Sequence, residues 1–529
     1  MPRSYTHRDP YFADLEIPAV DLLTLLFDSE HSLAKDASVV HVEAANPANK
    51  LTKSELRSFI EQVAHGLHTN YGTGANGPSQ DVVTVIGFGQ ILMPAVFYGV
   101  IAAGGVFSAA SPSSTVSELA RQISEAKSGL VICGREHVDV ATKAAAQCKL
   151  PARNILVLDS TSRSLNSIAG KVEAITGSRV PWDRVADRQA LRDSLIVILW
   201  SSGTTGLPKG VMLSHQNLVA ETITTSVYNR KWAMEQIEKG WMRKYNWPDL
   251  LRYAKAFKIT AFYTVPSIYL RMSKAPQVTD QFSWLAGAVT GAAPMDGKLQ
   301  QSANKKLGAA AGRPQQQLML GQTWGLSETT GAVTAVPAGE SDDTGSIGSI
   351  LPTIQLRLVD EDFQDVEPGQ EGELVIKGPV VTRGYYRNPS ATRDAFRDGW
   401  FCSGDIGVMR NGKFYVVDRK KYKGLQVAPA EIEGLLVEHP LIKEAAVIGL
   451  PDPSAGDLPC AFVVPEESGS LTATDVKKFV ADRMAPHNQL RGGVFFVDEI
   501  PKNAIGKLLR RELRERAKKE MGVAQGAKL

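Results

Sequence analysis

Short apolar runs alternate with mixed polar and apolar stretches along the first part of this chain. The clearest case lies between Asp81 and Glu118, where no charged residue occurs. Its apolar pieces, Val82–Ile86, Ile91–Ala103 and Val106–Ala110, are separated by glycines and have the lengths of a strand, a helix and a strand. We predict a buried strand–helix–strand unit here rather than a membrane span, which needs roughly 20 unbroken apolar residues.

Further strand-like runs continue this alternation with helical stretches. We expect strands at Leu130–Cys133, Ile155–Leu158, Leu195–Leu199, Ile259–Thr264 and Leu285–Thr290. Strands separated by helices predict mostly parallel sheets whose faces are covered by helices.

The pattern changes after Ile347. Short strands at Gln355–Val359, Glu373–Lys377 and Lys413–Val417 are split by Gly, Pro and Asn turns, which indicates a small β-rich subdomain. A compact segment of mixed helices and strands follows Asp418. The predicted fold class is α/β, with a large N-terminal domain at residues 1–417, a hinge at 418–421 and a small α+β C-terminal domain at 422–529.

Composition narrows the class of protein. Hydrophobic residues make up 43 % and charged residues 22 % of the 529 positions, which excludes a disordered chain. The 59 basic and 56 acidic residues leave a net charge of +3, so nucleic acid is not the expected partner. The four cysteines are far apart and form no CxxC pair, which argues against a disulfide framework or a zinc site.

The most informative segment is Trp200–Gly210, with the sequence WSSGTTGLPKG. It follows a predicted strand, its three glycines allow a close approach of the backbone to a ligand, and its four hydroxyl groups and Lys209 can donate to phosphate oxygens. It is not a Walker A loop, because Gly210 follows Lys209 where that motif has Ser or Thr. The segment predicts a polyphosphate-binding loop.

This loop, continued through His215, resembles the signature loop of the adenylate-forming enzymes, which include acyl-CoA synthetases, 4-coumarate:CoA ligases, firefly-type luciferases and nonribosomal adenylation domains. The resemblance covers roughly residues 35–515 and is closest to the 4-coumarate and medium-chain acyl-CoA ligase branch, including its fungal peroxisomal members. The segments Gly291–Pro294, Gly321–Glu328, Trp400–Asp405 and Pro501–Leu508 are similar to further motifs of this family.

The resemblance implies a role for each matched position. A flat ring suits adenine and a carboxylate suits a hard cation or two ribose hydroxyls. The nucleotide would be bound by Ser201, Ser202, Gly203, Thr204, Thr205, Lys209, Ala292, Gln322, Thr323, Trp324, Ser327, Asp405 and Arg419. CoA would be bound by Lys421, Lys423 and Gly424. The catalytic residues would be Lys507 and Glu328, and Glu328 would also hold Mg²⁺.

The implied reaction is that of an acid–thiol ligase with two half-reactions. A carboxylate attacks the α-phosphate of ATP and gives an acyl-adenylate and pyrophosphate; the mobile C-terminal domain then rotates, and the thiol of CoA displaces AMP. ATP, Mg²⁺ and CoA are the implied cofactor and cosubstrates, and an aryl or medium-chain acyl acid is the implied substrate. Gly287–Thr290 and Ala332–Thr334 outline a small, apolar acyl pocket.

Two segments are shorter than the family pattern. The spacing from His215 to Gly291 is 76 residues, which is roughly thirty fewer than expected and too large a loss for a trimmed loop, because a parallel crossover needs a dozen residues or more. Lys421 directly precedes Tyr422, where about four more residues are usual. These gaps, near 231–241 and 421–422, leave open the alternative of a catalytically impaired nucleotide-binding isoform. A second alternative, which does not depend on the gaps, is an adenylation enzyme that loads a carrier protein.

The last three residues, Ala527, Lys528 and Leu529, resemble the Ser-Lys-Leu peroxisomal signal. We therefore expect a peroxisomal protein that binds the import receptor, with the cytoplasm as the alternative location. The first residues contain no apolar core, so no secretory signal is expected there.

Overall fold

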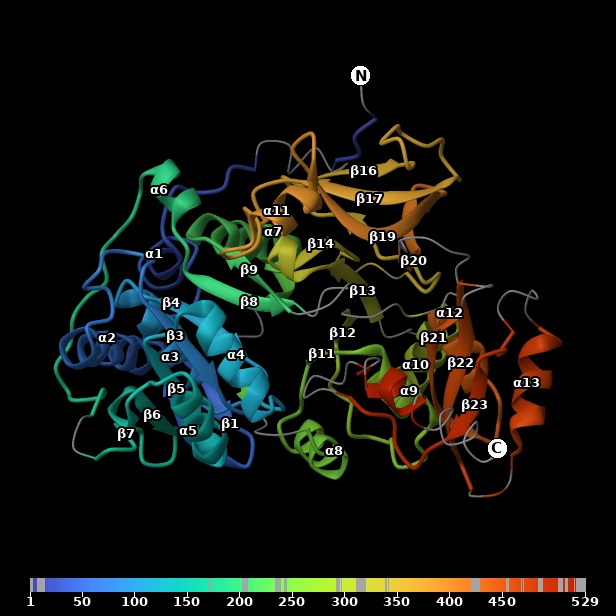
Figure 1. The fold of residues 1–529 in the computed structure, drawn as a ribbon, viewed down its shortest axis with the longest axis horizontal. Helices are drawn as coiled ribbons and strands as arrows, with labels where there is room; N and C mark the ends of the chain where they lie inside the picture. The colour runs from blue at the N-terminus through green and yellow to red at the C-terminus, as the bar shows by residue number, and fades with distance from the viewer. Residues whose placement is uncertain are drawn as a thin grey trace.

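The structure is a computed structural model. It describes residues 3–6, 15–170, 173–201, 208–233, 239–241, 245–291, 295, 297–310, 320–337, 340, 342–419, 429–452, 456–467, 469, 471–483, 489–502, 508–509, 512–517 and 519. Figure 1 shows the seven-stranded sheet and its helices on one side, the small C-terminal domain on the other, and two further sheets between them.

The largest sheet has seven strands in the order β7-β6-β5-β3-β4-β8-β9. Strands β6, β5, β3, β4 and β8 are parallel, and the two edge strands β7 and β9 run antiparallel to their neighbours. The strands are β3 (Val82–Ile86), β4 (Val106–Ala110), β5 (Leu130–Gly134), β6 (Ile155–Asp159), β7 (Ser164–Ser167), β8 (Val197–Ser201) and β9 (Lys209–Leu213).

Helices cover both faces of this sheet, as the apolar strands predict. Helices α2 (Lys53–Tyr71) and α3 (Met93–Ala102) pack with Leu130 and Ile132 on one face. Helices α4 (Val116–Ala126) and α5 (Val138–Gln147) pack with Val131 and Cys133 on the other. Successive residues of β5 therefore alternate between two cores, which explains why a strand without polar positions forms here.

The uncharged stretch from Asp81 to Glu118 forms β3, α3 and β4, so the predicted strand–helix–strand unit is confirmed. Among the described helices, none has the length and hydrophobicity that a membrane crossing needs. Helix α4 begins with a capping box, in which Thr115 and Glu118 satisfy each other's backbone N–H groups and fix where the helix starts.

A second sheet has the order β11-β12-β13-β14-β15. Its strands are β11 (Ala261–Thr264), β12 (Gly287–Thr290), β13 (Leu320–Gly325), β14 (Ala332–Ala335) and β15 (Ser349–Ile350), and the first three are parallel. Helices α8 (Trp247–Ala256), α9 (Pro266–Lys274) and α10 (Gly297–Ala310) belong to this part of the chain, and their apolar residues share one core with β12 and β13.

The β-rich subdomain that the sequence predicts is present. It contains β16 (Gln355–Val359), β17 (Glu371–Lys377), β19 (Trp400–Arg410) and β18 (Phe396–Arg397) in that order, and β20 (Lys413–Arg419) pairs with β19. Strand β20 runs to Arg419, so the first two residues of the predicted hinge belong to this strand.

A small sheet of β1 (Val39–Glu43), β2 (Asn46–Thr52) and β10 (Lys239–Trp241) was not predicted. Strand β10 lies at the predicted gap and pairs in parallel with β1, so that Trp241 is opposite Glu43. The remaining helices of the N-terminal domain are α1 (Leu22–Phe27), α6 (Arg188–Asp193), α7 (His215–Ala233) and α11 (Pro389–Ala395).

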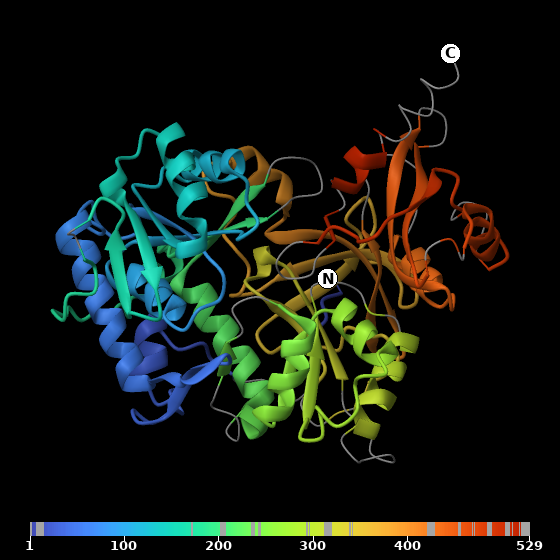
Figure 2. The ribbon, with the colours of Figure 1, turned by 90° about the horizontal axis from the view of Figure 1, so that it is seen from below.

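The C-terminal domain has its own sheet and its own core. Strands β21 (Ile442–Asp452), β22 (Gly456–Pro465) and β23 (Gly493–Phe496) pack against α12 (Pro429–Val437) and α13 (Ala473–Ala481). Figure 2 shows this domain beside the part of the chain that contains α9 and α10. Lys274 donates to the carbonyl of Val437 over 2.7 Å, and Lys298 pairs with Glu438 over 2.9 Å, so both domains meet at the end of α12.

Candidate active site

The predicted phosphate loop connects β8 with β9 at the edge of the seven-stranded sheet. Ser201 is the last residue of β8 and is the direct partner of Lys209, the first residue of β9. The two ends of the loop are therefore fixed side by side by the pairing of the strands. The strand is two residues further along the chain than predicted, so Ser201 itself lies in it.

Glu328 lies against the first of these residues. Its Oε1 atom accepts a hydrogen bond from the Ser201 hydroxyl over 3.2 Å and a second one from the Tyr385 hydroxyl over 3.0 Å. Only 8 % of Glu328 is exposed. The short 3₁₀ helix Ser327–Thr329 supplies this carboxylate, and Thr382 donates its backbone N–H to the carbonyl of Glu328 over 2.7 Å. The structure thus brings together two predicted site residues from segments that are 127 positions apart.

Sequence reasoning did not find Tyr385. Its ring lies under the ammonium group of Lys209, with Nζ 5.1 Å from the ring centroid, while its hydroxyl donates to Glu328. Only 8 % of the residue is exposed. A glycine followed by two tyrosines has no periodicity that would mark it as part of a site, because the contacts depend on strand pairing between distant segments.

A second pair of predicted residues is joined directly. The indole Nε1–H of Trp324 donates to Oδ2 of Asp405 over 2.9 Å, and 9 % and 4 % of these residues are exposed. Asp405 is also the cross-strand partner of Arg419 between β19 and β20. The residues predicted to meet adenine and ribose are therefore neighbours, and the carboxylate is already oriented by the ring.

The neighbouring polar residues of β13 are engaged within the protein. Gln322 is 3 % exposed, and its side-chain amide donates to the carbonyl of Met295 over 2.8 Å. The hydroxyl of Thr323 donates to the carbonyl of Thr334 over 2.8 Å, across to β14. Ser327 is partly exposed beside Glu328. The roles that the resemblance gives to these three side chains stay predictions.

Several predicted site residues lie outside the described residues. They are Ser202, Gly203, Thr204, Thr205, Ala292, Lys421, Lys423, Gly424 and Lys507. The side chain of Arg419 is also not described. The described part of the site therefore consists of the residues on β8, β9, β13, β19 and the 3₁₀ helix. It does not include most of the phosphate loop, the rest of the predicted hinge or the predicted catalytic Lys.

The acyl side of the site contains buried polar atoms without partners. Oγ1 of Thr290, at the end of β12, and Oε2 of Glu221, on α7, are both buried and make no hydrogen bond with the described residues. The other oxygen of Glu221 accepts the backbone N–H of Ala332 over 2.7 Å. Burial raises the pKa of Glu221 to about 7, although this hydrogen bond acts to lower it. The sequence predicts a small, apolar acyl pocket at Gly287–Thr290 and Ala332–Thr334, and it does not predict that a carboxyl group lies against Ala332.

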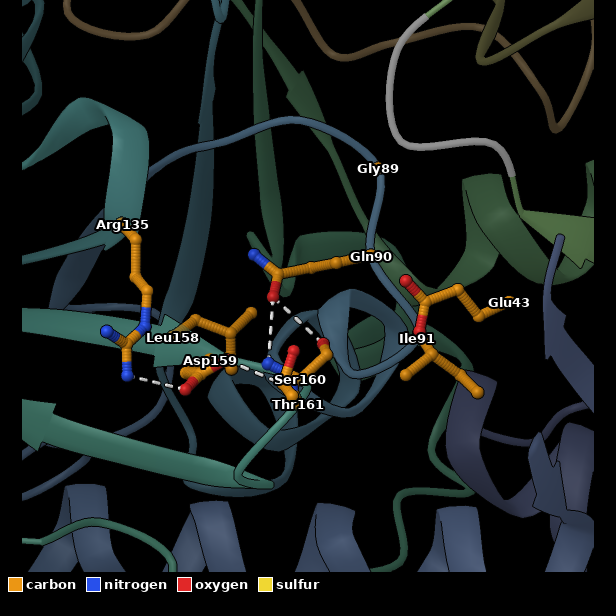
Figure 3. Close-up of a pocket in the computed structure, with 9 residues that line it drawn as sticks. All are labelled: Glu43, Gly89, Gln90, Ile91, Arg135, Leu158, Asp159, Ser160 and Thr161. Atoms are coloured by element: carbon orange, nitrogen blue, oxygen red, sulfur yellow. Dashed lines mark hydrogen bonds and ion pairs between the residues drawn. The ribbon is translucent and has the colours of Figure 1, made fainter. Parts of the chain in front are cut away.

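A cavity of about 280 Å³ lies elsewhere along the same sheet. Figure 3 shows Arg135 and Asp159 paired on one side of it and Glu43 on the other, while Gln90 reaches toward Ser160 between them. It lies at the carboxyl ends of β3, β5 and β6, and β4 and β8 separate it from the phosphate loop. Its lining consists of Glu43, Gly89, Gln90, Ile91, Arg135, Leu158, Asp159, Ser160 and Thr161. None of the predicted site residues belongs to it.

No cluster of His, Cys, Asp and Glu among the described residues could by itself hold a metal ion. The predicted cation site depends on Glu328 alone, with ligands that a nucleotide and water would have to supply. Oε1 of Glu328 is occupied by two hydroxyl donors, and Oε2 accepts no hydrogen bond from the described residues. The residues present therefore fit a cation that is bound mainly through phosphate groups.

Comparisons with known proteins show which family this chain belongs to. The profile of the AMP-binding enzyme family matches residues 30–242 and 237–386, and that of the AMP-binding enzyme C-terminal domain matches residues 431–507. A protein of Emericella nidulans, described as an acyl-coenzyme A synthetase, is 41 % identical over 551 positions, which cover 96 % of this chain and 98 % of that protein. A phenylacetyl-CoA ligase of Aspergillus niger is 31 % identical over 542 positions, with 95 % and 98 % covered.

The solved structure of ATP-bound MatB from Rhodopseudomonas palustris superposes with a TM-score of 0.78 at 25 % identity, covering 94 % of this chain and 99 % of that one. These similarities confirm the predicted fold class and the predicted resemblance. The impaired isoform and the carrier-loading enzyme are not favoured by relatives that are described as CoA ligases and synthetases.

The predicted gap has a counterpart in these matches. The family profile matches in two segments that meet at residues 237–242, which is where the sequence appears shortened. The alignment with the E. nidulans protein has 551 positions but takes in about 508 residues of this chain, so about forty positions face no residue here. A relative of similar overall organisation is therefore longer within its interior.

Proposed function

The chain belongs to the family of AMP-binding enzymes and is an ATP-dependent acyl-CoA ligase, and from this premise we propose that it activates an aryl or medium-chain carboxylic acid. In the first half-reaction, a carboxylate oxygen forms a bond to the α-phosphorus of ATP, and the bond from that phosphorus to the bridging oxygen breaks. The products are an acyl-adenylate and pyrophosphate. In the second, the CoA sulfur bonds to the acyl carbon, AMP leaves, and the thiol proton is released.

The observation that supports this proposal most directly is the junction of Ser201, Lys209 and Glu328. An ammonium group and a carboxylate lie at the two ends of a loop rich in glycine and hydroxyl groups, and both contact one buried tyrosine. Such an arrangement suits a polyphosphate chain, because the ammonium neutralises phosphate charge while the carboxylate faces a cation. No protein nucleophile is needed, since the carboxylate attacks ATP directly and the thiol attacks the acyl-adenylate directly.

We propose that Mg²⁺ accompanies ATP at Glu328. When bound, a hard cation of this kind neutralises the charge that develops on the phosphates. The chain's own contribution is to hold the carboxylate in place through Ser201 and Tyr385, so that Oε2 faces the nucleotide. Trp324 and Asp405 orient the nucleoside, and Lys507 is the predicted partner of the α-phosphate and the carboxylate.

An aryl acid is the first candidate substrate. The A. niger relative is described as a phenylacetyl-CoA ligase and matches almost all of this chain. The test is to incubate the protein with ATP, Mg²⁺, CoA and a panel of arylacetic, cinnamic and medium-chain fatty acids. Pyrophosphate release and the mass of the CoA thioester are then measured for each acid.

We expect at least one acid to give pyrophosphate and CoA thioester in equal amounts. Pyrophosphate release without any thioester, together with acylation of a carrier protein, would instead identify a carrier-loading enzyme. ATP binding without pyrophosphate release from any acid would contradict the proposed function.

We propose the peroxisome as the location of the protein, with the import receptor as its partner. The support is the terminal tripeptide Ala527–Leu529, which lies outside the described residues. A fluorescent protein fused to the last twelve or so residues is expected to enter peroxisomes, and removal of Leu529 is expected to leave it in the cytosol. A diffuse signal from the intact tail would contradict this location.

A further inference from the structure

Tyr385 contacts two predicted site residues with two different parts of its side chain. Its hydroxyl donates to Oε1 of Glu328 over 3.0 Å, and the face of its ring lies 5.1 Å from Nζ of Lys209. A tyrosine hydroxyl can donate only one hydrogen bond, and here that bond goes to the carboxylate. An ammonium group over an aromatic face is attracted by the negative potential of the ring.

Strand pairing places the tyrosine at this point. Tyr385 forms a bridge with Val211 of β9, the backbone N–H of Met212 donates to the carbonyl of Gly384 over 3.1 Å, and that of Tyr386 donates to the carbonyl of Gly210 over 2.7 Å. The segment around Tyr385 thus continues the seven-stranded sheet beyond β9, and its register relative to Lys209 is fixed by backbone hydrogen bonds.

Glycine is required immediately before the tyrosine. Gly384 has a φ of +133°, and a Cβ atom at this position would lie 2.4 Å from a side-chain atom of Thr392. Other residues adopt such a φ rarely, so this turn depends on glycine. The turn directs Tyr385 inward, where only 8 % of it is exposed.

The hydroxyl stays protonated in this environment. Burial and the neighbouring Glu328 carboxylate raise the pKa of Tyr385 far above its ordinary value. At neutral pH a tyrosine hydroxyl holds its proton, so Tyr385 donates and the Glu328 carboxylate accepts.

We propose that Tyr385 is a positioning residue. It holds the Glu328 carboxylate and the Lys209 ammonium at a fixed distance from each other beside the phosphate loop. This inference rests on the proposed function and adds a residue to it. The hydroxyl occupies Oε1 of Glu328 and leaves Oε2 to face a cation, and the ring keeps Lys209 beside the phosphates. The two contacts can be removed separately, because one belongs to the hydroxyl and the other to the ring.

The experiment is calorimetric titration of the protein with ATP, once with Mg²⁺ and once with a chelator. Tyr385→Phe removes only the hydroxyl. We expect it to weaken binding of Mg²⁺–ATP about tenfold and to change binding of metal-free ATP by less than about twofold, because a hydrogen bond to a charged group is lost while the ring remains. Tyr385→Leu removes the ring as well, and we expect it to weaken metal-free ATP binding about threefold in addition.

Tyr386→Phe is the matched control, since Tyr386 is the next residue, its ring lies against Arg387, and its hydroxyl makes no hydrogen bond with Glu328 among the described residues. Both of its affinities are expected to match those of the unmodified protein. Thermal unfolding of each variant shows whether it is folded at the temperature of the titration. Equal losses of affinity with and without Mg²⁺ in Tyr385→Phe, or no loss in either, would contradict the proposal.

The titrations also separate this proposal from the proposed function. Suppose that the unmodified protein binds Mg²⁺–ATP and yet releases pyrophosphate with none of the acids tested. In that case the proposed function is wrong, but the ATP affinities of the Tyr385 variants can still be compared. If an acid is turned over, Tyr385→Phe is expected to raise the KM for ATP about tenfold with little change in kcat. An unchanged KM with a reduced kcat would contradict a positioning role toward the nucleotide.

Discussion

The nucleotide side and the acyl side of the site differ in how completely the protein satisfies its own polar groups. On the nucleotide side, Glu328 accepts two hydroxyl hydrogen bonds and Asp405 accepts the Trp324 indole. On the acyl side, the Thr290 hydroxyl and one oxygen of Glu221 are buried and have no hydrogen-bond partner in the described part of the chain. Buried polar groups in proteins nearly always have partners, so the acyl side is less completely satisfied than the nucleotide side. The described residues contain four further atoms of this kind, on His65, His137, Asn304 and Thr353.

The exposed apolar side chains show the same asymmetry. Of the seven large apolar side chains that are exposed among the described residues, four lie between residues 245 and 284: Tyr245, Phe257, Tyr263 and Trp284. Tyr263 belongs to β11, which pairs only with β12 in the described part of the chain and so forms an edge of its sheet. These residues follow the shortened segment directly, and a family member with the additional strand and crossover would have material to cover them.

The largest expected effect comes from restoring that segment. The corresponding stretch of the E. nidulans relative would be inserted at residues 234–238, ahead of β10. If the insert covers about 200 Å² of apolar surface, the free energy of unfolding should rise by about 5 kcal/mol. Chemical denaturation of both proteins measures this difference, and the rate of thioester formation is expected to rise with it.

A Gly/Ser insert of the same length is the control, since it adds chain without apolar side chains. If both inserts change stability equally, or if neither alters thioester formation, the gap does not impair the acyl side. The contrast between the two sides would then have another cause.

Lys507→Ala tests the nucleotide side through a residue of the C-terminal domain. If Lys507 stabilises the transition state of adenylation, as we propose, loss of its positive charge is expected to slow acyl-adenylate formation by about 100-fold or more. Thioester formation from supplied acyl-adenylate should be unchanged, because the C-terminal domain is expected to rotate after adenylation and to carry Lys507 away from the α-phosphate. Lys502→Ala is the matched control within the same motif. If Lys507→Ala slows both half-reactions equally, the residue has no role specific to adenylation and instead supports the structure of the C-terminal domain.

Glu221→Gln sharpens the comparison through pH. Burial raises the pKa of Glu221 to about 7 in the folded protein, above its unfolded value near 4.5. Below the unfolded value both states hold the proton. As the pH rises from about 4.5 to about 7, the carboxyl ionises in the unfolded state but stays protonated in the folded state, so the free energy of unfolding falls. Above the folded pKa both states are ionised, and the stability that was lost is not regained.

Between pH 5 and pH 8 the unmodified protein should therefore lose about 2 to 3 kcal/mol more of its unfolding free energy than Glu221→Gln does. Denaturation curves at several pH values give this difference. Glu125→Gln, on the exposed face of α4, should follow the unmodified protein. If the free energy of unfolding depends on pH in the same way for Glu221→Gln and the unmodified protein, burial does not raise the pKa of the Glu221 carboxyl.

Trp324→Phe has the smallest expected effect. It keeps a ring for adenine but removes the indole N–H from Asp405, and a hydrogen bond to a charged group contributes about 1.5 to 3 kcal/mol. We expect a loss of unfolding free energy near the lower end of that range and a rise of a few-fold in the KM for ATP. Trp200→Phe removes a similar bond to a neutral acceptor, the Ser108 hydroxyl at 3.0 Å, and should cost less. If both variants lose the same free energy of unfolding, the charge of Asp405 does not strengthen its hydrogen bond with Trp324.

Much of the fold follows from local patterns in the sequence. The strands Val82–Ile86, Val106–Ala110 and Gln355–Val359 begin and end where the apolar and turn residues predict. These elements are set by runs of apolar residues bounded by Gly, Pro or charged residues, which act within a few positions of the chain.

The parts that could not be predicted depend on contacts between distant segments. Tyr385 joins the site because its segment pairs with β9, and β10 joins β1 across almost 200 residues. Glu221 lies on an ordinary helix, and nothing in its neighbours shows that its carboxyl reaches Ala332. Within the site, the sequence motifs predicted Ser201, Lys209, Glu328, Trp324 and Asp405, but not the hydrogen bonds that hold them together.

We expect the nucleotide side to be complete enough for the bound acid to be adenylated before CoA binds. The most direct measurement is acid-dependent exchange of labelled pyrophosphate into ATP, with Mg²⁺ present and CoA omitted. We predict exchange with the acids that give a CoA thioester, and about tenfold weaker apparent ATP affinity in Tyr385→Phe. An exchange that is absent without CoA, although Mg²⁺–ATP binds, would contradict the account.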